Sequence, residues 1–101
     1  MNNHNFDVLI VEDSLSYAIV LERMCKEIGL SVIVSVADSA SALDIIFAEY
    51  PDLILMDNNI GGMLRGEEVG KEIDHLGIPT SIHYFTWRNQ IWYSMQNRLI
   101  W

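Results

Sequence analysis

Cysteine, proline and positive charge are all scarce in this sequence. Its single cysteine, Cys25, cannot form a disulfide within the chain, and a reducing compartment fits best. Lysine and arginine number 6 against 14 aspartates and glutamates, so the net charge of −8 disfavours binding to nucleic acid or to anionic lipid. No apolar run approaches the ~20 residues of a membrane helix, and no basic cluster precedes an apolar run at the start. We therefore expect a cytoplasmic protein without membrane or nucleic-acid partners.

Short apolar runs and amphipathic stretches alternate along the 101 residues, a suitable length for one domain. Apolar or β-branched runs predict strands over residues 6–11, 30–37, 53–57 and 80–86. Helical periodicity predicts helices after Ser14 and over residues 67–75. A further helix would begin at a cap, Asp38 or Ser39, and end before Pro51. This alternation predicts an α/β fold with a parallel sheet and right-handed crossovers.

Acidic residues follow two of the predicted strands at the point where each strand ends. Glu12 and Asp13 come directly after the first strand, and Asp57 closes the third. If these strands are neighbours, three carboxylates meet at one edge of the sheet, where they repel each other unless a cation joins them. Hard oxygen ligands favour Mg²⁺ or Mn²⁺, and a carboxylate can attack phosphorus. The alternative is that each acid is only a turn residue or a helix cap.

Several segments resemble the receiver domain of response regulators. Residues 7–14 (DVLIVEDS) look like its opening, residues 37–43 like the start of its second helix, and residues 51–57 (PDLILMD) like its phosphorylation strand. Residues 57–66 are similar to the family's variant with a longer, glycine-containing loop. The resemblance covers residues 6 to about 80. It implies a flavodoxin-like doubly wound parallel sheet, with about four strands in this chain.

The resemblance also implies a function and a set of site residues. Glu12 and Asp13 match the acidic pair that binds Mg²⁺, and Asp57 matches the phosphoacceptor, which is also a metal ligand. Asn59 matches the position whose backbone carbonyl completes the metal shell. The implied function is a phosphoacceptor of a two-component phosphorelay, a signalling domain that catalyses at most its own phosphotransfer. The implied donor is a histidine kinase, a phosphotransfer protein or a small phosphodonor.

The sequence departs from the family at two positions. The family's hydroxyl residue usually lies five residues after the proline that opens strand four, where this chain has Tyr84. Thr86, two residues later, is therefore the candidate for the contact to the phosphoryl group. The family's lysine after strand five has no counterpart, because residues 87–101 contain no lysine. These departures support an alternative, a degenerate receiver used for dimerisation or scaffolding. A phosphatase using an aspartyl phosphate is disfavoured, because Asn59 stands where such enzymes place an acid.

Residues 87–101 form a tail of unusual composition. Only these 15 residues follow Thr86, too few for another strand and its helix, and they hold all three tryptophans. We expect a receiver-like domain over residues 1–86, with the fifth unit missing or replaced by a helical aromatic tail. Two interpretations of the tail remain open: a native replacement for the fifth unit, or a truncated or out-of-frame end. Without a fifth strand, strand four would be an exposed edge, so we expect a homodimer through this edge or through the tail.

Overall fold

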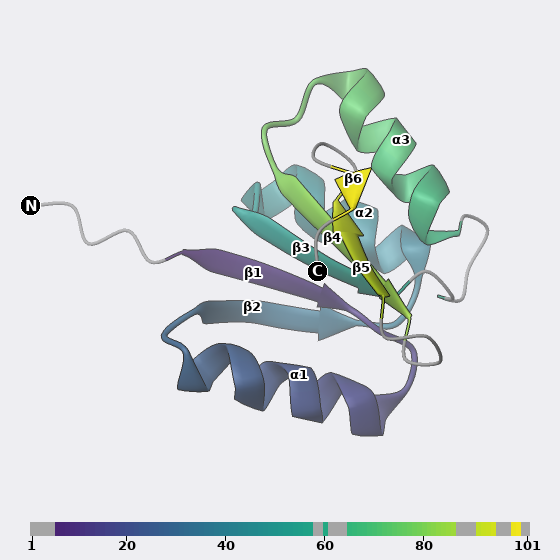
Figure 1. Cartoon of the computed structure of the whole chain (residues 1–101). Coiled ribbons are helices and arrows are strands. Elements are labelled where there is room, and N and C mark those ends of the chain that lie inside the picture. Colours follow the sequence, from purple (N-terminus) through teal and green to yellow (C-terminus); the bar gives the residue numbers. More distant parts are fainter. Residues whose placement is uncertain (1–5, 58–59, 61–64, 87–90, 95–97, 100–101) are drawn as a thin grey trace, which may run out of the picture.

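The structure, a computed structural model, describes residues 6–57, 60, 65–86, 91–94 and 98–99. The strands are β1 (Asp7–Val11), β2 (Ser31–Val36), β3 (Leu53–Asp57), β4 (Ser81–Thr86), β5 (Ile91–Ser94) and β6 (Arg98–Leu99). The helices are α1 (Leu15–Glu27), α2 (Ser39–Glu49) and α3 (Gly66–Leu76). These strands form one sheet in the order β2-β1-β3-β4-β5-β6, and the first four in that order are parallel (Figure 1). The predicted α/β class and the flavodoxin-like arrangement are confirmed.

Two of the predicted helix boundaries are explained by local hydrogen bonds and backbone angles. The side chain of Asp38 accepts a hydrogen bond of 2.8 Å from the backbone N–H of Ser41, so Asp38 rather than Ser39 caps α2. The same bonds to Ser41 lower the pKa of the Asp38 carboxyl below its ordinary value. At the other end, Tyr50 has a positive φ of 47°, and Pro51 cannot continue the helix.

Helices cover the sheet on both sides. On one face, α2 and α3 pack against β1, β3 and β4, and the buried side chains are Leu9, Val11, Ala42, Ile46, Ile54, Met56, Val69, Ile73, Ile82 and Tyr84. On the other face, α1 packs against the sheet, and the buried side chains are Val8, Ile10, Leu21, Cys25 and Phe85. Figure 1 shows this separation of α1 from the other two helices. Burial on both faces explains why β1 and β3 are continuous apolar runs rather than alternating ones. In the described part of the chain, no helix is long and apolar enough to cross a membrane.

The helix predicted for the tail is wrong where the structure describes it. Ile91–Ser94 and Arg98–Leu99 are strands, and β5 pairs antiparallel with β4 from Thr86↔Ile91 to His83↔Ser94. Only four residues separate β4 from β5, which suits an antiparallel return but is too short for a parallel crossover. A strand that pairs with the free backbone groups of the β4 edge is more stable than a short helix isolated in water. The prediction of an exposed strand-four edge is therefore wrong over residues 83–86, and a homodimer through those residues is not available.

The stability of this fold should depend on the protonation of His83. This side chain is half-buried in β4, and its removal from water lowers its pKa below the ordinary value. The unfolded chain then binds a proton at a higher pH than the native protein does, so the free energy of unfolding should fall between about pH 7.5 and about pH 5.5. Urea denaturation at both pH values measures this fall. His83→Gln should flatten it, whereas His75→Gln, at the exposed end of α3, should not; an equal slope in His83→Gln and wild type would contradict the assignment.

Candidate functional site

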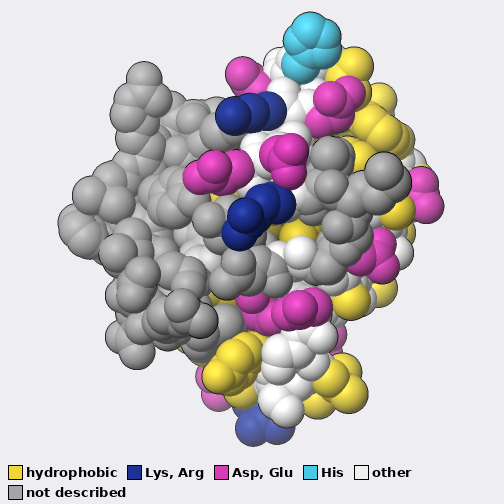
Figure 2. Space-filling view, turned by 90° about the vertical axis from the view of Figure 1, so that its right-hand side faces the viewer, with side chains coloured by type: hydrophobic (Ala, Val, Ile, Leu, Met, Phe, Trp, Pro, Cys, Tyr) yellow, Lys and Arg dark blue, Asp and Glu magenta, His cyan; other side chains and the backbone are white. Residues whose placement is uncertain are grey.

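Three carboxylates meet where β1 and β3 end. These strands are parallel neighbours, and Val11 pairs with Met56, so the next residues along each strand are Glu12 and Asp57. One carboxylate oxygen from each of Glu12, Asp13 and Asp57 lies within 4.8 Å of the other two. The structure thus brings together the acids that the sequence placed after separate strands. Figure 2 looks at the edge of the sheet where the strands end, and acidic side chains are visible there.

The burial of the three acids differs. Glu12 is 3% exposed and Asp57 is 6% exposed, whereas Asp13 is open to solvent. The carboxylate of Glu12 accepts a hydrogen bond of 2.9 Å from the backbone N–H of Ser14, and the backbone N–H of Glu12 donates to the carbonyl of Val36 at 2.9 Å. Sequence reasoning identified Ser14 only as a helix cap. Its second role is that its backbone N–H holds the Glu12 side chain in one orientation. The only trace of this role in the sequence is an acid two residues before the cap.

The donor set fits a hard divalent cation. Carboxylate oxygens are the usual ligands of Mg²⁺, which binds oxygen at about 2.0–2.1 Å, so opposite ligands lie about 4.2 Å apart. The three acids, with oxygens no more than 4.8 Å apart, therefore need only small side-chain movements to surround such an ion. Bringing this much negative charge together without a cation costs free energy. Asn59, whose carbonyl was predicted as a further ligand, lies outside the described residues.

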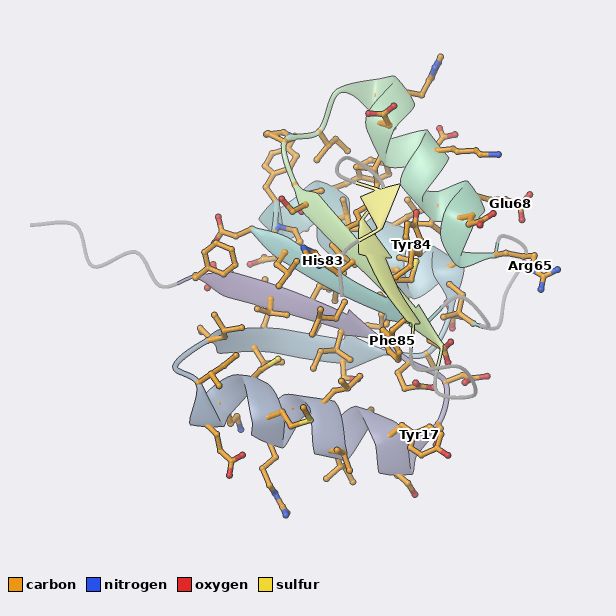
Figure 3. All side chains as sticks on the ribbon, in the orientation of Figure 1. Tyr17, Arg65, Glu68, His83, Tyr84 and Phe85 are labelled. Atoms are coloured by element: carbon orange, nitrogen blue, oxygen red, sulfur yellow. The ribbon has the colours of Figure 1, made fainter. Side chains whose placement is uncertain are left out.

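The two hydroxyl candidates on β4 occupy different places. Tyr84 pairs with Met56 and is completely buried in the face covered by α2 and α3. Phe85 pairs with Asp57, so the backbone of Thr86 lies one position further along, at the edge that carries the acids. Figure 3 labels Tyr84 and Phe85, which precede this position on β4. The side chain of Thr86 is outside the described part of the structure, but the register excludes Tyr84 from the acidic edge.

An apolar groove begins beside the acids. Glu12 and Asp13 line it together with the first turns of α1 and the end of β2, including Leu15, Ile19 and the acidic Glu22. Leu15 is 75% exposed and Ile19 is 50% exposed. A partner that reaches the carboxylates from this side would bury these apolar side chains.

Replacement of the exposed acid should separate charge repulsion from metal binding. Without Mg²⁺, Asp13→Asn should raise Tm by about a few degrees, because it removes one of three clustered negative charges. With Mg²⁺, wild type should gain stability through ion binding, and the variant should lose most of this gain. Thermal unfolding with and without Mg²⁺ measures both effects, with Asp74→Asn on the exposed side of α3 as the control. A gain in Asp13→Asn equal to that of wild type would exclude Asp13 as a ligand.

Comparison with solved structures places the fold among signal receiver domains. The receiver domain of a putative Luxo repressor protein from Vibrio parahaemolyticus superposes with a TM-score of 0.76 and 32% identity, covering 82% of this chain and 62% of that one. The receiver domain of a modulated diguanylate cyclase from Desulfovibrio desulfuricans G20, described as an example of alternate folding, has a TM-score of 0.71 and 28% identity. That match covers 79% of this chain and 63% of the other.

Comparison of sequences agrees with the structural match. A protein-glutamate methylesterase/protein-glutamine glutaminase of Natronomonas pharaonis is 24% identical over 82 residues, which are 81% of this chain but only 23% of that protein. The chain thus spans about a quarter of the length of this relative. The model of the response regulator receiver domain family matches residues 8–97, and therefore includes β5. The chain belongs to the response regulator receiver domain family, whose members are signalling modules of two-component phosphorelays.

Proposed function

We propose that this receiver domain accepts a phosphoryl group on Asp57 in a Mg²⁺-dependent manner. The single observation that carries the proposal is the acidic cluster, in which oxygens of Glu12, Asp13 and Asp57 lie within 4.8 Å of one another. Asp57 is nearly buried at the end of β3, so its carboxylate is held at the edge of the sheet rather than free in a loop. This arrangement suits both a cation site and a positioned nucleophile.

The proposed reaction is a transfer between a phosphodonor and a carboxylate. An Asp57 oxygen attacks phosphorus, a phosphorus–oxygen bond forms, and the bond from phosphorus to the donor's nitrogen or oxygen breaks with its electron pair leaving on the donor. Glu12, Asp13, Asp57 and the Asn59 carbonyl would hold Mg²⁺, which when bound supplies positive charge for the phosphoryl oxygens. The hydroxyl of Thr86 would donate a hydrogen bond to one of those oxygens. Positioning and charge compensation are the main requirements of such a transfer, so the domain can assist its own phosphorylation.

A histidine kinase or a phosphotransfer protein is the proposed donor. Receiver domains as a family interact with such proteins. In this chain, the largely apolar groove that Glu12 and Asp13 help to line gives a donor protein a surface to bury beside the acceptor. The cytoplasmic location, the end of the receiver-like part at residue 86 and a homodimer through the tail stay predictions from the sequence.

Acetyl phosphate provides the test of the proposed function. With Mg²⁺, the intact protein should gain the mass of one phosphoryl group, and reductive trapping of the acyl phosphate should locate it on Asp57. With EDTA in place of Mg²⁺, the gain should disappear. A folded protein that gains no phosphoryl group from acetyl phosphate or from a phosphohistidine donor would instead support the degenerate receiver, which the complete acidic cluster disfavours.

A further inference from the structure

The proposed phosphorylated state has an unbalanced charge. A phosphoryl group on Asp57 carries about two negative charges at neutral pH and would lie beside Glu12 and Asp13. One divalent cation offsets only part of this charge. Residues 87–101, which follow β4, contain no lysine. Another cation near the edge would stabilise the phosphorylated state, and this reasoning rests on the function proposed above.

The described basic side chains differ in their distance from the acidic edge. On α1, Arg23 and Lys26 lie eight and eleven residues beyond Leu15, or about 12 and 17 Å along a helix that runs away from the edge. On α3, Lys71 lies six residues after Arg65, or about 9 Å further along. Among the four described lysine and arginine side chains, Arg65 is therefore the one nearest the end of the sheet that carries the acids.

Packing and hydrogen bonding hold Arg65 at that edge. Val69, one helical turn later, is completely buried in the same core cluster as Val11 and Met56. Those two residues directly precede Glu12 and Asp57. The backbone N–H of Arg65 donates a hydrogen bond of 2.8 Å to the carboxylate of Glu68, which fixes the start of α3. The Arg65 side chain is exposed and projects on the side of the molecule where the strands end (Figure 3).

We propose that the guanidinium of Arg65 binds the phosphoryl oxygens on Asp57 and supplies the positive charge that lysine supplies elsewhere in the family. A guanidinium offers two parallel N–H donors to a phosphoryl group and stays protonated at all physiological pH values. Arg65 neither gains nor loses a proton in the transfer. The Glu68 carboxylate accepts a hydrogen bond from the backbone N–H of Arg65. The Arg65 side chain is exposed to solvent, where an incoming anion can reach it.

Beryllofluoride, a stand-in for the phosphoryl group on an aspartate, gives a direct binding test. In the presence of Mg²⁺, ¹⁹F NMR of the full chain should show binding to wild type. Arg65→Ala should weaken this binding about 10- to 100-fold, the effect expected for one charge-assisted contact. Arg65→Lys should recover part of the affinity, and Lys71→Ala, which removes the same charge further along α3, should leave it unchanged. Because Arg65 is exposed, its contribution should decrease as ionic strength rises.

The outcomes separate this inference from the proposed function. If wild type binds beryllofluoride and Arg65→Ala binds it equally well, the role of Arg65 is overturned while Asp57 remains the acceptor. The same conclusion follows if Arg88→Ala, in the tail, weakens binding and Arg65→Ala does not. If folded wild type does not bind beryllofluoride with Mg²⁺ at all, the phosphoacceptor function fails and the inference fails with it. Circular dichroism of each variant confirms that the comparison is made between folded proteins.

Discussion

Asp57→Asn should abolish phosphorylation of the protein by acetyl phosphate or by a phosphohistidine donor. The amide has nearly the shape of the carboxylate, so the nearly buried position at the end of β3 should still be filled. It carries no charge and is a poor nucleophile, so the attack on phosphorus is lost. The substitution also removes one of three clustered negative charges, so the folded variant should be at least as stable as wild type without Mg²⁺. A loss of activity can therefore be separated from a loss of folding.

The measurement is the mass of the intact protein after incubation with donor and Mg²⁺. Wild type should carry one phosphoryl group, and Asp57→Asn should carry none. Asp44→Asn, on the exposed side of α2, is the matched control and should be phosphorylated like wild type. A phosphoryl group that accumulates equally on Asp57→Asn would show that another residue is the acceptor, and the interpretation of the acidic cluster as a phosphorylation site would be wrong.

Much of the parallel part of the fold could be predicted because its signals are local. The run from Val8 to Val11 and the run from Leu53 to Met56 have no polar interruption, which is typical of strands buried on both faces. Asp38 is followed three residues later by Ser41, whose N–H it binds, so its capping role was also a local feature. The meeting of the acids required one non-local fact, that β1 and β3 are neighbours. Spacing alone left this condition open, and the family resemblance suggested it.

The tail could not be predicted from its own pattern. Ile91 and Leu99 stand at a spacing that also fits one side of a helix, and no local signal excludes that reading. The strand conformation of β5 depends on the edge of β4, to which it pairs, and that edge exists only in the folded sheet. Pairing with a preformed edge outweighs a local helical preference. The prediction of the site missed one contact for a similar reason. The backbone N–H of Ser14 donates a hydrogen bond to the Glu12 carboxylate, and residue types do not reveal backbone contacts.

Tyr84→Thr should strongly destabilise the protein, although it places a hydroxyl residue at the family's usual spacing from Pro79. Tyr84 is completely buried and pairs with Met56 in the core covered by α2 and α3. Replacing its ring by a small side chain leaves a cavity and removes buried contacts, and comparable truncations of large aromatic side chains cost about 3–5 kcal/mol. This is a large fraction of the stability of a small domain. Tyr84→Phe keeps the ring and should retain most of the stability.

The same substitution decides which hydroxyl serves the phosphorylation site. If the register of β4 is as described, residue 84 points into the core, and the threonine introduced there cannot reach a phosphoryl group on Asp57. Tyr84→Thr should then not restore phosphorylation to Thr86→Ala, which should itself accept the phosphoryl group more slowly because it lacks a donor to the phosphoryl oxygens. Urea denaturation measures the stability of each variant, and transfer from acetyl phosphate at a temperature where both are folded measures the rate. Restoration of the rate by Tyr84→Thr would contradict this register, because position 84 reaches the place that Thr86 occupies only if β4 is shifted by two residues in solution.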